Sequence, residues 1–307
     1  MTFSTATLPP SPDSNWEQLQ TLIESAPDLA PLARLQLRAI RTALDASWLE
    51  GVPDLAAHPP SAPDTPLLQA RTLIVSTNRL RKLSSELAAD LVAPAEPSTR
   101  LLAAVRTGSS DPIEMIYAAV TYDQERITRM AAQIDVDPES LGVVAQVSAL
   151  PLLLASGQRA APLISGASWS DGFCPVCGAW PMLAELRGLD RDHWLRCGRC
   201  ATQWLHPPAQ CIYCGEQDHE QLSYLAPEDE RESRRAVTCE RCRGYLKTFA
   251  TLGPLSAAEL LARDLSSIEL DLAALEAGYS RPSTTGYRLD LRIEAARSAP
   301  SWLRWRS

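Results

Sequence analysis

The sequence predicts an α+β protein of several domains, in which an all-α N-terminal domain is followed by tandem rubredoxin-like or zinc-ribbon-like metal-binding units and a closing helix. Three observations predict this class. Apolar residues recur at helical spacing through the first half, all eight cysteines are confined to 174–242, and helical spacing returns after residue 250. The boundaries that we expect are a helical domain over 1–165, two metal-binding units over 166–208 and 209–250, the closing helix over 251–280, and a tail with Arg and Trp residues over 281–307.

The first domain is predicted to be helical from its periodicity and its helix starts. Ser14 and Glu17 match a capping box, in which each side chain bonds the other residue's backbone N–H. Asp111 and Asp137 each precede a proline, and proline suits the first position of a helix. An amphipathic stripe is formed by apolar residues three and four apart, namely Leu37, Ile40, Leu44 and Trp48.

The stretch after residue 250 again carries helix signals. Ser256 and Glu259 repeat the capping-box pattern, and Gly278 suits the end of a helix. Between them, leucine and isoleucine recur at spacings of four and three, at Leu261, Leu265, Ile268, Leu272 and Leu275. This pattern predicts one closing helix that packs back on either the helical domain or the metal-binding units.

Charge and hydropathy narrow the classes of protein to consider. The net charge of −8 disfavours a general nucleic-acid binder, because phosphate contacts require a basic face. The N-terminus has neither the basic start nor the apolar run of a secretory signal. The apolar stretch from Leu141 to Ala155 is interrupted by polar residues and is shorter than the roughly 20 residues that span a bilayer. We therefore expect a cytoplasmic protein without membrane insertion.

The cysteines form four C-x-x-C motifs, which begin at Cys174, Cys197, Cys211 and Cys239. In a reducing cytosol, clustered pairs of this kind indicate metal ligation rather than disulfides. Gly178 and Gly215 directly follow two of the motifs, where a tight loop requires a positive φ. The predicted metal ligands are all eight cysteines: Cys174, Cys177, Cys197, Cys200, Cys211, Cys214, Cys239 and Cys242.

Two motifs facing each other give a tetrahedral four-sulfur site. Nineteen residues separate the first two motifs and twenty-four the last two, so we expect sequential pairing, with interleaved pairing as the alternative. Such a site accepts Zn or Fe, and the ligands do not decide between them. Its usual role is to fold a segment that is too small for its own core. One-electron iron chemistry and display of a partner-binding surface are the functional alternatives.

Other polar residues around the motifs are expected to have simpler roles. His193 and His206 flank the second motif, and with eight cysteines already filling two sites we expect them to pack or face solvent. Asp190 and Asp192 interrupt a run of arginines, which predicts a solvated face of mixed charge at Arg187, Arg191, Arg196 and Arg199. No phosphate-binding loop or catalytic triad pattern stands out, so the sequence does not predict an enzyme.

The motifs and their surroundings resemble the formate dehydrogenase accessory protein family, FdhE, over about 170–280. Besides the cysteines, the resemblance is carried by Trp194-Leu195, Thr202, Trp204, Tyr245-Leu246-Lys247, Ala262-Arg263-Asp264-Leu265, Leu270-Asp271 and Glu276-Ala277-Gly278-Tyr279-Ser280-Arg281. There are departures: Leu205 and Arg243 stand where the family usually has His and Gly.

The resemblance implies a cytoplasmic protein with iron in rubredoxin-like sites, whose ligands would be the eight cysteines. It also implies a role in the activity of respiratory formate dehydrogenases, through contact with their catalytic subunit. The hypothesis from the sequence is therefore a non-catalytic accessory or maturation factor with two metal ions, iron or zinc, that binds this subunit. The alternatives are a rubredoxin-like one-electron redox protein and a nucleic-acid-binding zinc ribbon. The oligomeric state stays open.

Overall fold

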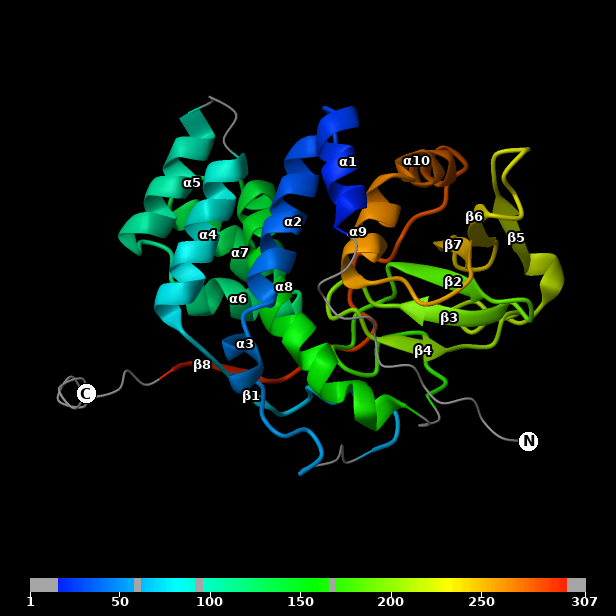
Figure 1. Cartoon of the computed structure of the whole chain (residues 1–307), viewed down its shortest axis with the longest axis horizontal. Helices are drawn as coiled ribbons and strands as arrows, with labels where there is room; N and C mark the ends of the chain where they lie inside the picture. The colour runs from blue at the N-terminus through cyan, green and yellow to red at the C-terminus, as the bar shows by residue number, and fades with distance from the viewer. Residues whose placement is uncertain (1–15, 58–61, 92–95, 166–168, 297–307) are drawn as a thin grey trace.

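The computed structural model describes residues 16–57, 62–91, 96–165 and 169–296, and these form a helical half beside a half built on one sheet (Figure 1). The predicted fold class is confirmed. The N-terminal capping box is not tested, because Ser14 lies outside the described residues, as do Trp302 and Trp305 of the tail.

The helical half is assembled around α8 (Pro138–Ile164), which contacts α2, α3, α4, α6 and α7. The remaining helices are α1 (Glu17–Ser25), α2 (Ala30–Ala43), α3 (Ser47–Glu50), α4 (Thr77–Leu91), α5 (Glu96–Thr107), α6 (Pro112–Thr121) and α7 (Gln124–Gln133). Both predicted aspartate caps are present. Asp111 accepts a hydrogen bond from the Ile113 N–H at 2.9 Å, and Asp137 accepts one from the Ser140 N–H at 2.7 Å.

α8 is longer than the interrupted apolar stretch suggested, because it continues through Pro151. A proline inside a helix removes one backbone hydrogen bond, and here packing of α8 against five other helices offsets that cost. By length and composition α8 could cross a membrane, but 72% of its most apolar window is buried inside the protein. A core helix of a globular fold accounts for both properties.

The second half contains a six-stranded sheet in the order β4-β3-β2-β7-β6-β5. Its strands are β2 (Leu183–Arg187), β3 (Asp192–Arg196), β4 (Gln203–Leu205), β5 (Leu222–Leu225), β6 (Arg234–Cys239) and β7 (Tyr245–Thr251), with a short 3-10 helix η1 (His219–Gln221) before β5. β2 and β7 pair in parallel and the other neighbours are antiparallel. Each metal-binding unit therefore contributes three consecutive antiparallel strands, and the two units repeat side by side along one continuous sheet.

The predicted closing helix is divided into α9 (Ala257–Leu265) and α10 (Ile268–Glu276). The break follows from Ser267, whose hydroxyl donates to the carbonyls of Arg263 and Asp264 and so satisfies the end of α9. The capping box at Ser256 is present. α9 packs on α1 and α2, whereas α10 packs on β5, β6 and β7, so the closing segment contacts both halves.

The apolar stripe of the closing segment changes its environment at this break. Leu261 and Leu265 on α9 are buried. The next members of the same heptad-like pattern lie on the outer side of α10, with exposed fractions of 45% for Ile268, 54% for Leu272 and 55% for Leu275. The spacing of these apolar residues therefore predicted helix correctly, but it did not predict which of their side chains are buried.

A two-stranded parallel pair lies in the helical half and was not predicted. β1 (Thr72–Val75) pairs with β8 (Arg292–Ala295), which comes from the tail segment. β8 contacts α6, and Leu289, Leu291 and Ile293 enter the large core that fills the helical half. The end of the described chain thus returns to the first half (Figure 1).

Candidate metal centres

The four C-x-x-C motifs adopt one backbone shape. In each, the N–H of the first cysteine donates to the carbonyl five residues later, at 2.8 Å for Cys174, 2.9 Å for Cys197, 2.8 Å for Cys211 and 3.0 Å for Cys239. The residue after the second cysteine always has a positive φ: 69° at Gly178, 56° at Ala201, 75° at Gly215 and 56° at Arg243. The two glycines were predicted to do this, and the alanine and the arginine were not.

The motifs meet in the sequential pairs. Cys174, Cys177, Cys197 and Cys200 form the first site, and Cys211, Cys214, Cys239 and Cys242 form the second site. Within each site the four Sγ atoms all lie within 4.8 Å of one another, and all eight cysteines are free of disulfides.

The sulfur spacing matches a tetrahedral ion. Sγ–Sγ separations between the paired motifs are 3.5 Å for Cys174–Cys200 and Cys177–Cys197 in the first site, and 3.7 and 3.8 Å for the corresponding pairs of the second. A tetrahedron with metal–sulfur bonds of about 2.3 Å has edges of about 3.8 Å. Each group could therefore hold one metal ion, and four sulfur donors suit Zn or Fe.

The electrostatics of the first site also fit a cation. Burial raises the pKa of Cys174 and Cys200 far above that of an ordinary thiol. Burial opposes ionisation of Cys197 as well, but hydrogen bonds from the other sulfurs hold its pKa well below the usual range. Without an added positive charge, the four sulfurs share their protons rather than all becoming thiolates. A divalent ion removes that conflict.

The two sites differ in exposure. All four cysteines of the first site are buried, whereas Cys214 and Cys242 of the second site are exposed. The first site lies between the halves, because the backbone of Cys200 packs directly against α8. The approach is so close that a Cβ at Gly157 of α8 would overlap the carbonyl oxygen of Cys200. Arg199, between Cys197 and Cys200, is buried and donates to the carbonyls of Ala119 at 2.6 Å and Val120 at 3.2 Å, at the end of α6.

The arginine run is not the solvated face that the sequence suggested. Arg196 is also buried, where it pairs with the fully buried Glu185 and donates to the carbonyl of Leu255 at 2.6 Å. Arg187 also pairs with Glu185, with its Nε atom 2.9 Å from the second carboxylate oxygen. Of the four arginines, Arg191 alone is exposed, with 42% of its side chain accessible. The neighbouring aspartates indicated solvent, but Arg196 lies at the buried end of β3 and Arg199 lies in the cysteine loop that packs on α6.

His193 and His206 lie outside both cysteine groups. Their ring centroids are 6.0 Å apart, and the Nδ1 atom of His193 lies 3.2 Å from the backbone carbonyl of His206. Burial, and then the charge of His206, lower the pKa of His193 to about 4. His193 is therefore a neutral packing residue at physiological pH.

Aromatic side chains connect the surroundings of the two sites. Trp180, three residues after Cys177, meets Tyr213, which lies between Cys211 and Cys214. Their ring centroids are 5.1 Å apart in an edge-to-face arrangement. Phe173, next to Cys174, contacts the other side of Trp180 at 6.3 Å. Trp180 thus packs between the loops that carry the two cysteine groups.

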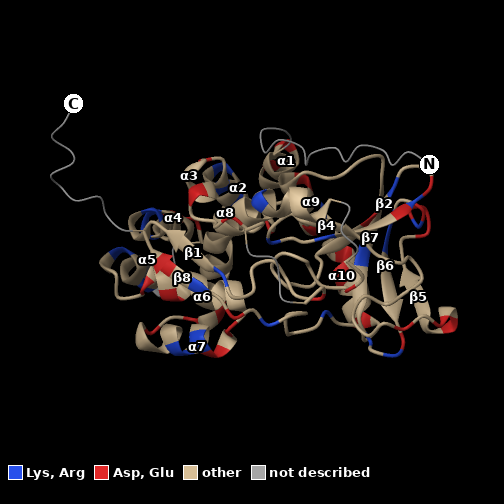
Figure 2. Ribbon diagram, turned by 90° about the horizontal axis from the view of Figure 1, so that it is seen from below, with Lys and Arg blue, Asp and Glu red and all other residues tan. Residues whose placement is uncertain are grey.

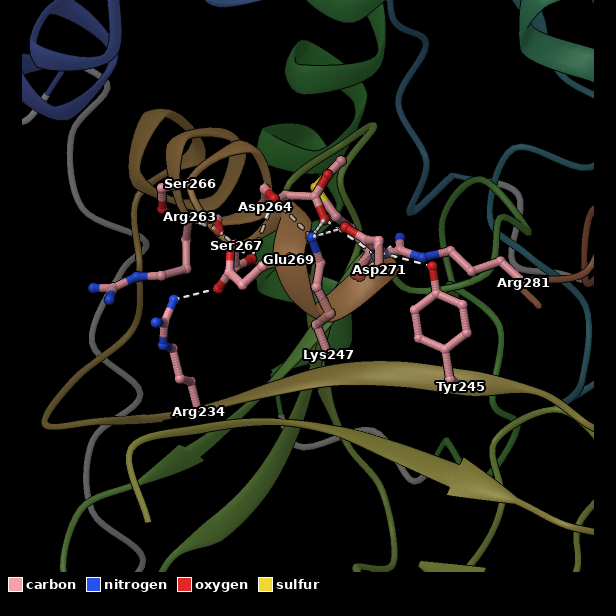
Figure 3. A network of polar contacts seen from close by, with 11 residues as sticks. Arg234, Tyr245, Lys247, Arg263, Asp264, Ser266, Ser267, Glu269, Asp271 and Arg281 are labelled. Atoms are coloured by element: carbon pink, nitrogen blue, oxygen red, sulfur yellow. Dashed lines mark hydrogen bonds and ion pairs between the residues drawn. The ribbon is translucent and has the colours of Figure 1, made fainter. Parts of the chain in front are cut away.

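A buried polar network fixes the closing helices on the sheet (Figure 3). Lys247 of β7 is fully buried, and its Nζ lies 2.7 Å from carboxylate oxygens of both Asp264 and Asp271. Arg281 reaches the same carboxylates at 3.2 and 3.0 Å, and the Tyr245 hydroxyl donates to Asp271 at 2.8 Å. These residues were noted in the sequence only through the family resemblance, because no local pattern brings them together.

Comparison with known proteins points to one family. The family described as "FdhE, C-terminal domain" matches residues 209–287. The crystal structure of the FdhE protein from Pseudomonas aeruginosa superposes over 89% of this chain and 94% of that one, with a TM-score of 0.55 and 25% identity. Residues 209–287 match the FdhE C-terminal domain, and the fold resembles that of an FdhE protein over most of its length.

Curated FdhE relatives agree over a shorter stretch. The Protein FdhE homolog of P. aeruginosa is 38% identical over 122 residues, which are 37% of this chain and 38% of the relative. That of Aquifex aeolicus is 32% identical over 117 residues (36% and 40%), and Protein FdhE of Escherichia coli is 32% identical over 114 residues (36% of each). These alignments span well under half of each relative, whereas the likeness to the FdhE crystal structure extends over both halves of the fold.

Proposed function

We propose that this chain is a non-catalytic accessory factor that binds the catalytic subunit of a respiratory formate dehydrogenase in the cytoplasm and is needed for its activity. We further propose that each cysteine group holds one iron or zinc ion. The observation that carries the proposal is the pair of closed four-sulfur groups within a fold that matches an FdhE crystal structure over most of its length.

The donor set argues for a role in assembly rather than in hydrolysis. All four positions around each ion would be filled by cysteine sulfur, which leaves no position for a water molecule. Bound ions would supply folding free energy to strands that are three to seven residues long. The described chain then presents a rigid sheet beside a helical half, which is suited to holding a partner.

Co-purification tests this function directly. Affinity-tagged chain, expressed with a respiratory formate dehydrogenase, should recover its catalytic subunit, and a deletion strain should lose formate oxidation. The Cys211→Ser variant tests the contribution of the second site, and Lys82→Met on the exposed face of α4 is a matched surface control. No recovery of the subunit together with normal formate oxidation in the deletion strain would contradict the proposal.

A rubredoxin-like redox role is the second candidate, and the aromatic contact between the sites favours it. Trp180 and Tyr213 place a continuous aromatic path between the two motifs that precede β2 and β5. Visible absorbance that bleaches on reduction would support this role, and stoichiometric zinc in protein from iron-replete cells would exclude it. Figure 2 shows acidic and basic residues mixed along both described halves, which disfavours the nucleic-acid-binding alternative.

A further inference from the structure

Each metal site holds the C-terminal end of a helix through an arginine stacked on a tyrosine. At the first site, Arg199 donates to the last carbonyls of α6, at Ala119 and Val120. Its guanidinium carbon lies 4.4 Å from the ring centroid of Tyr122, the residue that ends α6. The last carbonyls of a helix have no partner within the helix, so a cation placed there is favourable in both charge and hydrogen bonding.

The second site repeats this arrangement on α10. Arg243, directly after Cys242, donates to the carbonyls of Ala277 at 2.7 Å and Gly278 at 3.4 Å, just beyond the end of α10. Its guanidinium carbon lies 4.0 Å from the ring centroid of Tyr279. The Ser280 N–H donates to the carbonyl of Arg243 at 2.8 Å. We call the contacts of Arg243 with 277–280 the α10 clamp.

The two clamps differ in what else holds the helix. Arg199 is buried in the joint between the halves, and α6 is packed against α4, α7, α8 and β8. Arg243 is 45% exposed, and the C-terminal part of α10 lies at the surface beside the exposed second site. The first part of α10 has an independent anchor, because Asp271 belongs to the Lys247 network. The end of α10 is held by the fourth motif together with the buried side chains of Ala274 and Tyr279, and Arg281 after it is anchored again in the Lys247 network. Of these contacts, those of Arg243 come from the fourth motif.

The conformation of Arg243 makes the clamp sensitive to the ion. Its φ of 56° is unfavourable for a residue with a side chain, and the closed loop from Cys239 to Gly244 maintains it. An ion ligated by Cys239 and Cys242 would hold this loop closed. Without the ion, the motif keeps only the backbone hydrogen bond from Cys239 to Gly244 and weak sulfur contacts of 3.7 and 3.8 Å at its exposed side.

We propose that the second metal site is a metal-dependent clamp on α10: its ion keeps the end of α10 closed, and loss of the ion releases 277–280 while the first site stays intact. This inference rests on the proposed ion in the second site. The clamp makes the order of the end of α10 depend on the ion. That end adjoins the exposed apolar face of α10, which is formed by Ile268, Leu272 and Leu275.

Amide hydrogen exchange on the metal-loaded full chain, with ion content measured in parallel, tests the clamp. A chelator titrated until one ion per chain is lost should speed exchange of the amides of Gly278, Tyr279 and Ser280 about tenfold or more, the factor expected for losing one charged hydrogen bond. Amides of α6 and of α9 should be unchanged. The variant Arg243→Ala should produce the same local acceleration while both ions remain bound.

Two further variants keep the test decisive. Arg243→Gly removes the side chain without the backbone strain, so acceleration in that variant cannot come from a distorted motif. Arg241→Ala is the matched control, because Arg241 belongs to the same motif but pairs with Glu216 and does not reach α10. Unchanged exchange at 278–280 after loss of the second ion would overturn the clamp alone. Purified protein with no ion in the second site would overturn both the clamp and the proposed metal content.

Discussion

Ala201 and Arg243 hold a left-handed backbone conformation that their side chains disfavour. They occupy the positions that Gly178 and Gly215 occupy in the other two motifs. The strain is tolerated because the closed motif fixes the backbone from both sides. Arg243 gains the α10 clamp in return, whereas the structure shows no side-chain contact that requires alanine at 201.

Replacement of Ala201 by glycine should therefore stabilise the protein. We expect Ala201→Gly to raise the free energy of unfolding by about 0.5–1 kcal/mol, since glycine adopts a positive φ without steric cost. Denaturant unfolding of metal-loaded protein measures the change. Ala273→Gly, at an exposed position of α10, is the control and should lower stability by about 1 kcal/mol. Equal losses in both variants would contradict the strain at Ala201.

His193 should make stability fall in mildly acidic solution. Its pKa is lowered from 6.5 to about 4 in the folded protein, so the unfolded chain binds its proton more readily. The contribution of His193 is fully present above pH 6.5 and is lost as pH falls toward 4, by about 2 kcal/mol between about pH 7 and about pH 5.

The His193→Gln variant isolates this contribution. Loss of ions from the cysteine sites also lowers stability in acid. The test is therefore a comparison between variant and parent of how the free energy of unfolding changes with pH. Denaturant unfolding at several pH values measures it. The variant should show the flatter profile. Parallel profiles would show that His193 keeps its ordinary pKa.

At the scale of elements, the Lys247 network positions α9 and α10. Burial opposes ionisation of Asp271, but hydrogen bonding to Lys247 and the charge of Lys247 lower its pKa below the usual value. Lys247→Met keeps most of the side-chain volume and leaves the two carboxylates of this network with one cation, Arg281, besides the Tyr245 hydroxyl. We expect a loss of about 3 kcal/mol in the free energy of unfolding, because breaking a buried ion pair leaves uncompensated charge.

Thermal or denaturant unfolding measures that loss, and the other lysine supplies the control. Lys82 is exposed on α4, and Lys82→Met should change stability by less than about 0.5 kcal/mol. If the two variants were equally stable, the network would contribute nothing net to the docking of the closing helices.

Local patterns predicted the elements that are specified locally. The aspartate caps at Asp111 and Asp137 and the box at Ser256 identified helix starts correctly, because caps bond within one turn. Each C-x-x-C motif is also local, and the short segments of 19 and 24 residues between the paired motifs favoured the sequential pairing that the structure has. β1 was missed because it has four residues and its partner β8 lies in a distant segment. The break between α9 and α10 was missed because Ser267 interrupts the helix without disturbing the apolar spacing.

At the scale of the whole molecule, the first site joins the two halves and the second does not. Cysteines 174, 177, 197 and 200 belong to the same continuous core as the helices. The second site lies toward the surface of the sheet. The two ions should therefore leave in order, the second before the first, when a chelator is added.

Ion content and unfolding measured together test this order. Loss of the second ion should leave the helical half folded, and loss of the first should coincide with loss of most helical signal in circular dichroism. Cys174→Ser and Cys197→Ser should lack the same ion, and Cys211→Ser should retain it, because the sulfurs group sequentially. Simultaneous loss of both ions in Cys211→Ser would show that the sites are not independent.

The pairing of β8 with β1 also has a consequence for synthesis. The ribosome completes β1 about 200 residues before it reaches β8, which at 5–20 residues per second is a delay of roughly 10–40 s. During that interval the nascent chain carries β1 with one backbone edge unsatisfied, and Ile293 is missing from the core. The helical half, although translated first, can be completed only after the sheet and residues 292–295 have been synthesised.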